Sequence, residues 1–183
     1  DKPANASLEG YLYPESFQKT ADTTPEQLVT ASLDEMQKRL TPDLRAAFAR
    51  QKLTVNNAII LASIVEKEVS KESDKPIVAQ VFLKRLDMGM VLGSDVTAFY
   101  GAIMAGQEPS VLFESPYNTH TYGGLPPGPI SNVSVESLQA VANPSKTDWL
   151  YFVAGDDGIT YFSRTLAEHE ALTAQHCKKL CSL

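Results

Sequence analysis

The stretch "AIILASIVEKEVSK", residues 58–71, places two carboxylates, Glu66 and Glu68, at the end of an almost unbroken apolar run. A helical projection of about 100° per residue gathers the apolar side chains of this stretch into one broad arc. The two glutamates lie at opposite margins of that arc, and neither lies on the face opposite to it. The pattern therefore predicts a core helix that carries two partly dehydrated carboxyl groups.

Either carboxyl group could serve as a general acid. A carboxyl at an apolar margin loses hydration, which disfavours the charged form and raises the pKa toward the range of a proton donor. Periodicity alone does not choose between Glu66 and Glu68. The alternative is that both acids reach solvent and pair with nearby lysines, namely Lys67, Lys71 or Lys75.

Length and composition describe a globular chain. With 183 residues, 43% of them hydrophobic and 21% charged, the sequence can form one domain with a core, with or without a small appendage. It contains no run of about 18 apolar residues, and its N-terminus has neither the charged nor the apolar part of a signal peptide. We therefore expect no membrane crossing within this sequence, and its start at Asp1 without methionine suggests an excised fragment.

The charge balance bears on partners. The formal net charge is -6 and the isoelectric point is near 5.1. Nucleic-acid binding would need clustered lysines and arginines to neutralise phosphates. Nucleic acid is therefore not an expected partner.

The two cysteines, Cys177 and Cys181, lie four residues apart beside His176. A structural metal site usually needs four ligands, and the sequence offers no second cluster to complete one. Free thiols or a local disulfide are the expected states. We predict neither a metal nor a cofactor.

Proline and glycine divide the first half of the chain into elements. The segment "LEGYLYPESFQ", residues 8–18, alternates in character up to Tyr13 and predicts a short strand. Cap-and-proline signals predict helices over 24–40 and 41–51. Two further helices are expected within 54–89, broken near residues 74–76 and closed by Gly89.

The second half changes in texture. From "VLGSDVTAFYG" to "ESPYNTHTYGGLPPGPISN", residues 91–132, the chain is rich in Gly, Pro, Ser, Asn and Tyr, which is typical of a binding or active-site segment. Beyond it we expect a helix, a strand "WLYFVA", an Asp-Asp-Gly turn, a strand "ITYFS" and a terminal helix. The predicted fold class is α+β, a helix-rich single domain with short strands and a glutamate on a core helix.

Several segments together resemble one family. These are "LEGYLYPESF", "LASIVEKE", "VAQVFLKRLDMGMVLGSDVTAFYG", "SPYNTHTYGGLPPGPISN", "LQAVANPSKTDWLYFVA" and "ITYFSRTLAEH", in order and with ordinary spacing. They resemble the endolytic murein transglycosylases of the MltG (YceG-like) type, from about Leu8 to about His169. The array that includes Y-N-T and G-L-P-P-G-P-I is specific.

The resemblance implies a location and partners. Residues 1–183 would be the catalytic domain of a protein whose N-terminal membrane anchor and LysM-like region are not in this sequence. The full-length protein would then be a single-pass membrane protein at the extracytoplasmic face of the bacterial cytoplasmic membrane. Its implied partners are peptidoglycan glycan strands and peptidoglycan synthases.

The resemblance also implies a reaction and a catalyst. The family cuts the β-1,4 bond between N-acetylmuramic acid and N-acetylglucosamine inside nascent strands and leaves 1,6-anhydro-muramyl ends. The family's acid would correspond to Glu66, with Glu68 in a structural or supporting role. One carboxyl suffices, because it can protonate the glycosidic oxygen and then accept the proton of the muramyl C6 hydroxyl.

A Y-N-T motif and a proline-rich loop are expected to bind substrate. Hydroxyl and amide groups suit sugar hydroxyls and N-acetyl groups, although an Asx-type turn after Pro116 is the alternative for the motif. The loop could wall the glycan-binding groove, or could simply be rigid. The candidate residues are Tyr117, Asn118, Thr119, Gly124, Leu125 and Pro126.

Further candidates lie elsewhere in the sequence. Glu9 and Tyr11 could line the cleft, although core packing is at least an equal alternative for the tyrosine. Asp95 could orient the acid or bind sugar, or could cap a helix over "VTAFYG". His120 stands where relatives often carry an aromatic such as Tyr, and we treat it as a groove-wall candidate and not as a base.

Two other function classes stay open. A hydrolytic muramidase would need a second carboxylate beside Glu66, and Glu9, Asp95 or Glu114 could supply it. A non-catalytic peptidoglycan-binding module would keep the groove without an acid.

Overall fold

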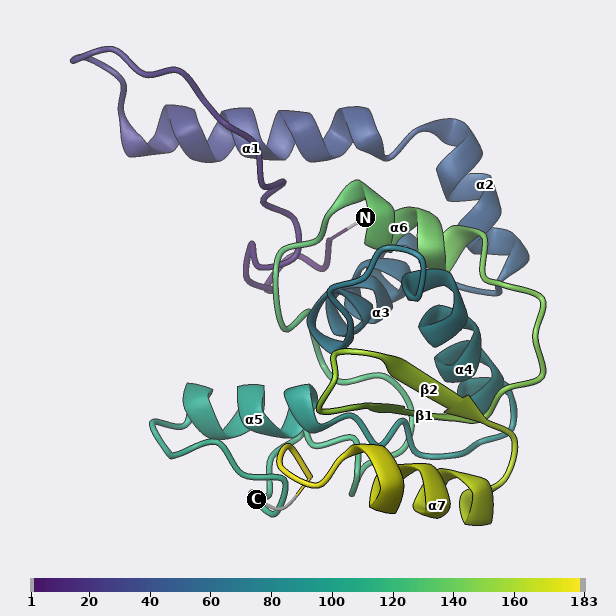
Figure 1. The fold of residues 1–183 in the computed structure, drawn as a ribbon. Coiled ribbons are helices and arrows are strands. Elements are labelled where there is room, and N and C mark those ends of the chain that lie inside the picture. Colours follow the sequence, from purple (N-terminus) through teal and green to yellow (C-terminus); the bar gives the residue numbers. More distant parts are fainter. Residues whose placement is uncertain (1, 182–183) are drawn as a thin grey trace.

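A computed structural model describes residues 2–181, which form seven α-helices and one two-stranded antiparallel sheet (Figure 1). This confirms a helix-rich single domain with short strands. In chain order the elements are α1 Pro25–Arg39, α2 Pro42–Arg50, α3 Val55–Glu68, α4 Lys75–Asp87, α5 Asp95–Met104, α6 Val135–Ala142, β1 Tyr151–Ala154, β2 Thr160–Ser163 and α7 Leu166–His176.

Local capping signals fix where the first three helices begin. The side chains of Thr24, Thr41 and Thr54 each accept a hydrogen bond from a backbone N–H three residues later. Prolines at the first position of α1 and α2 need no hydrogen bond there. The predicted starts of these helices are therefore confirmed.

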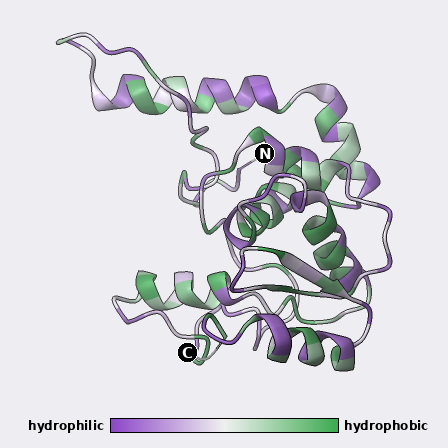
Figure 2. Ribbon diagram, viewed as in Figure 1, coloured by the Kyte–Doolittle hydropathy of each residue, from purple (hydrophilic) through white to green (hydrophobic). Residues whose placement is uncertain are grey.

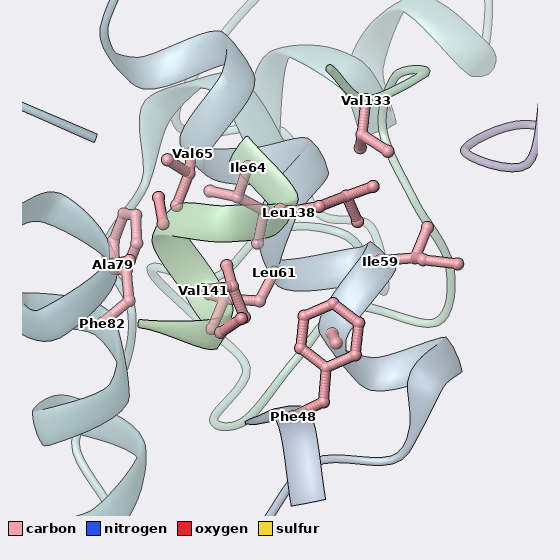
Figure 3. Close-up of a cluster of buried hydrophobic side chains, with 14 of the residues drawn as sticks. Phe48, Ile59, Leu61, Ile64, Val65, Ala79, Phe82, Val133, Leu138 and Val141 are labelled. Carbon is pink, nitrogen blue, oxygen red and sulfur yellow. The ribbon is translucent and has the colours of Figure 1, made fainter. Parts of the chain in front are cut away.

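Helix α3 forms the centre of the domain. Every residue from Ala58 to Val65 is buried, and α3 packs against α2, α4, α5 and α6. Figure 3 shows Phe48 of α2, Phe82 of α4 and Leu138 of α6 around it. Burial of one large apolar side chain contributes about 1.5–3 kcal/mol, so this packing makes α3 a firm support for its last turn.

The segment before α1 is a turn and not the predicted strand. Gly10 has a φ of +81° and donates its N–H to Asn132 Oδ1 at 2.9 Å, and the Tyr11 N–H bonds the Leu8 carbonyl. A Cβ at position 10 would lie 2.5 Å from the Pro129 side chain. The tyrosines are buried by contact with the core, which produces the alternation that a strand would also show.

Two helices also differ from the prediction, one in its end and one in its presence. Helix α3 ends at Glu68, several residues before the expected break, because Val69 is extended. Helix α5 lies inside the stretch expected to be irregular, and Figure 2 shows it as largely apolar.

No helix within residues 2–181 combines the length and the apolar character needed to cross a membrane.

The C-terminal third follows the prediction. Strands β1 and β2 form a hairpin in which Phe152 pairs with Phe162, and α7 packs against both strands. Cys177 and Cys181 form a disulfide, which confirms one of the two expected states. Within the part of the chain that the structure describes, no group of three or more His, Cys, Asp or Glu side chains is arranged to hold a metal ion.

Candidate active site

The carboxyl group of Glu66 is held at the start of α6. Its Oε2 atom accepts hydrogen bonds from Ser134 Oγ at 2.6 Å, Ser137 Oγ at 2.5 Å and the Ser134 N–H at 3.1 Å. Lys75 Nζ, on the first residue of α4, lies 3.2 Å from the same oxygen. Because Ser134 is the N-cap residue of α6, Glu66 ties α3, α4 and α6 together.

These contacts favour the charged form of Glu66. Burial opposes ionisation, but the hydrogen bonds from Ser134 and Ser137 and the charge of Lys75 outweigh it and lower the pKa of Glu66. The N-terminus of a helix also favours an anion. The expectation of a raised pKa at Glu66 is therefore wrong, and the alternative of pairing with Lys75 is confirmed for this residue.

The carboxyl group of Glu68 lies in a different environment. Its Oε1 atom accepts a hydrogen bond from Ser94 Oγ at 2.5 Å. Burial raises the pKa of Glu68, and the charge of Asp95 raises it further. The Ser94 hydrogen bond and the charges of Arg85 and His120 lower it. The result is a pKa raised from 4.5 to about 7. The predicted raised pKa thus occurs at Glu68, for which the family resemblance implies a structural or supporting role.

Glu68 lines a pocket of about 330 Å³. The pocket lies between the start of α5, the strand β1, the helix α7 and the C-terminal segment. Glu66 is not among its lining residues. The lining residues are Glu68, Arg85, Gly93, Asp95, His120, Phe152, Val153, Ala154, His169, Thr173, Cys177, Leu180 and Cys181.

Asp95 and His120 form a pair at this pocket, with His120 Nε2 at 2.8 Å from Asp95 Oδ1. The expectation that Asp95 caps a helix is wrong by one residue, because Ser94 is the N-cap of α5 and Asp95 is the first helical residue. The Ser94 side chain makes no capping bond and donates to Glu68 instead. Asp95 is thus free of a capping role and lines the pocket.

Arg85 is a pocket residue that no motif in the sequence singles out. Its Nε donates to the Leu150 carbonyl at 2.9 Å, its guanidinium also donates to the Leu92 carbonyl, and it lies 5.1 Å from the centre of the Tyr151 ring. Arg85 therefore joins α4 to β1 and to the segment before α5. Nothing in "FLKRLDMG" distinguishes it from a surface arginine, since its partners are distant in sequence.

Two residues of the Y-N-T motif, Asn118 and Thr119, are buried and bond to residues at or beside the pocket. Asn118 is 1% exposed, and its Nδ2 donates to the carbonyls of Val111 and Phe113 while its Oδ1 accepts from the His120 N–H. Thr119 is equally buried, and its Oγ1 accepts from the backbone N–H of Ser94. The hydrogen bond from the His120 N–H to the Asn118 side chain is that of the Asx-type turn. The two buried side chains thus hold the backbone of His120 and of Ser94 in place.

The proline-rich loop packs along α3. The Ile130 N–H donates to Ser63 Oγ at 3.0 Å, and Ser131 Oγ donates to the Ser63 carbonyl at 3.2 Å. Leu125 packs against the core and Pro126 is buried. Gly124, Leu125 and Pro126 do not line the pocket of Glu68, and their role in substrate binding stays a prediction.

Glu9 and Tyr117 come together at a separate place. Tyr100 Oη donates to Glu9 Oε2 at 2.5 Å, and the rings of Tyr100 and Tyr117 lie 4.8 Å apart. Tyr11 is buried and donates its hydroxyl to Asn56 Oδ1, as its core-packing alternative requires. Of the predicted substrate-binding and groove-wall residues, all of which the structure describes, Asp95 and His120 line the pocket with Glu68.

The model of the YceG-like family matches residues 1–175, and the chain belongs to this family. A crystal structure of a yceG-like protein from Listeria monocytogenes superposes with a TM-score of 0.81 at 37% identity, and covers 94% of this chain and 57% of that one.

Two curated relatives carry the name endolytic murein transglycosylase. The protein of Streptococcus pneumoniae serotype 2 strain D39 is 35% identical over 96% of this chain and 33% of its own length. The protein of Bacillus subtilis strain 168 is 34% identical over 88% of this chain and 46% of its own length. This chain thus spans between a third and a half of these relatives.

Proposed function

We propose that this domain cleaves peptidoglycan glycan strands as a lytic transglycosylase and that Glu68 is its single acid and base. The observation that carries the proposal is the Glu68 carboxyl, which lines the pocket with a pKa raised to about 7. The names of the two relatives support the substrate class. A group of this pKa can both donate and accept a proton near neutrality.

One carboxyl group is enough for both proton transfers of the proposed reaction. The protonated form of Glu68 gives its proton to the oxygen between N-acetylmuramic acid and N-acetylglucosamine, and the bond from that oxygen to the muramyl C1 breaks. The carboxylate then takes the proton of the muramyl C6 hydroxyl, whose oxygen bonds C1 and closes the 1,6-anhydro ring. Glu68 ends protonated, and no water is consumed.

The neighbours of Glu68 suit both halves of this cycle. Burial and Asp95 favour the protonated acid before the bond breaks, whereas the Ser94 hydroxyl and the charge of Arg85 stabilise the carboxylate after it. Because burial outweighs the stabilising contacts and brings the pKa of Glu68 to about 7, neither form is strongly preferred at neutral pH.

The family resemblance implies Glu66 as the acid, whereas we propose Glu68 for this role. Four hydrogen-bond donors converge on one oxygen of Glu66 and hold it as a carboxylate. An acid with a lowered pKa is a poor proton donor at neutral pH. We propose that Glu66 has a structural role and holds α3, α4 and α6 together.

Hydrolysis is the second candidate, because Asp95 lines the same pocket as Glu68. A hydrolytic muramidase would use such a second carboxylate to activate water or to form a glycosyl intermediate. Digestion of uncrosslinked glycan strands, followed by mass spectrometry of the new ends, separates the two reactions. Anhydro-muramyl ends indicate lytic cleavage, reducing ends indicate hydrolysis, and binding without cleavage indicates a binding module.

Location and partners are part of the same proposal. We propose that the full-length protein is anchored at the extracytoplasmic face of the cytoplasmic membrane and acts beside peptidoglycan synthases. Membrane fractionation of the full-length protein tests the anchor, and cross-linking in cells tests the synthases. Recovery of the full-length protein in the soluble fraction would contradict the anchor.

A further inference from the structure

One wall of the pocket lies outside the region that the family model matches. The match covers residues 1–175, whereas Cys177, Leu180 and Cys181 line the pocket beside Glu68. Cys177 is 4% exposed and Leu180 is 58% exposed. The buried cysteine therefore anchors a short C-terminal segment whose leucine stays accessible at the pocket.

Hydrogen bonds and a covalent bond hold this segment in place. The Asp156 carboxylate, in the turn between β1 and β2, accepts from the backbone N–H groups of Lys178, Lys179 and Leu180 at 2.8 to 3.2 Å. The Asp156 N–H donates to the His176 carbonyl at 2.7 Å. The hydrogen bonds of Asp156 fix the segment to the hairpin, and the disulfide closes a loop within the segment.

The segment gives the pocket an apolar side. The disulfide and Leu180 lie with the β1 residues Phe152, Val153 and Ala154 around the pocket. Its polar part is supplied by Glu68, Arg85, Asp95, His120, His169 and Thr173. Such a mixture of apolar wall and few polar groups is typical of a site that orients a small amphipathic group. An N-acetylated sugar has this character, since it carries hydroxyls and an acetamido methyl.

We propose that residues 177–181 form a specificity wall in which Leu180 and the disulfide contact the acetamido methyl of a bound N-acetylated sugar. This proposal rests on the proposed function for its ligand class. It names Leu180 as a substrate-contacting residue. It also assigns the disulfide the task of holding that contact in place.

Binding of short oligosaccharides tests the wall without relying on cleavage. In a Glu68→Gln background, chitotetraose carries the acetamido groups, and cellotetraose is a neutral analogue without them. Leu180→Ala should raise the dissociation constant for chitotetraose about three- to tenfold, since a partly exposed leucine contact is worth less than full burial, and should leave cellotetraose binding nearly unchanged. Lys178→Ala is the matched control and should change neither, because its backbone bond to Asp156 is retained.

Equal chitotetraose affinity in Leu180→Ala and Lys178→Ala would overturn the wall, and so would failure of the parent to bind chitotetraose at all. If the leucine dependence is found but the wild-type protein does not cleave glycan strands, the wall stands and the proposed function fails. The double variant Cys177→Ser/Cys181→Ser should weaken chitotetraose binding in the same direction while the domain stays folded. Unchanged affinity there would overturn the role given to the disulfide.

Discussion

Lys75 Nζ lies 3.2 Å from Glu66 Oε2, and only 6% of the lysine side chain is exposed. Glu66→Gln would leave this buried ammonium group without its counter-charge. We expect the free energy of unfolding to fall by about 1–3 kcal/mol. Urea denaturation at pH 7 measures the change, with the exposed Glu72→Gln as control. Equal stability of Glu66→Gln and wild type would contradict a tying role for Glu66.

The raised pKa of Glu68 predicts a pH-dependent stability. The folded state keeps the proton up to about pH 7, whereas the unfolded chain loses it near 4.5, so the stability falls as the pH rises between these values. Glu68→Gln should remove this loss and be more stable than wild type at pH 8, by up to about 3 kcal/mol. The two proteins should be nearly equal at pH 4. A stability difference that stays constant across this range in urea titrations would argue against the raised pKa.

Ser94→Ala should move the activity profile toward higher pH. The Ser94 hydroxyl stabilises the Glu68 carboxylate, so its removal raises the pKa of Glu68 further. Cleavage requires the protonated acid, and the limb of kcat/KM that falls with rising pH should therefore shift upward. The exposed Ser70→Ala, two residues beyond Glu68, is the control. A downward shift in Ser94→Ala would contradict the account.

Asn118→Ala should destabilise the domain. If Asn118 bound sugar at the surface, this variant would stay folded and lose only sugar positioning. The structure instead buries Asn118 with three backbone partners, so the variant leaves buried polar groups unpaired and should lose about 2–4 kcal/mol. Thermal melting measures this, with the exposed Asn5→Ala as control. A melting temperature close to wild type would restore the substrate-binding alternative.

Local signals predicted most of the elements. Threonine caps followed by proline gave the starts of α1 and α2, and the Asp-Asp-Gly turn between two aromatic runs gave the hairpin. The apolar run 58–65 gave the central helix α3. Each of these depends on residues a few positions apart, so the sequence alone contains the information.

The choice between the two glutamates depends on partners far along the chain. Glu66 meets Ser134, 68 residues later, and Glu68 meets Ser94, 26 residues later. Both acids lie at similar apolar margins of α3, so periodicity does not reveal which one finds a helix N-terminus that stabilises its charge. Packing of α5 and α6 makes that difference. For the same reason Arg85 and the C-terminal wall were missed.

The central claim is that Glu68 donates the proton and Glu66 does not. The direct test compares Glu68→Gln and Glu66→Gln on the same uncrosslinked glycan strands, below both melting temperatures, with anhydro-muramyl ends counted by mass spectrometry. We predict that Glu68→Gln loses about 10² to 10⁴ in rate, the typical cost of removing general acid–base catalysis, while folded Glu66→Gln keeps substantial activity. Near wild-type cleavage by Glu68→Gln, together with a silent but folded Glu66→Gln, would contradict the assignment.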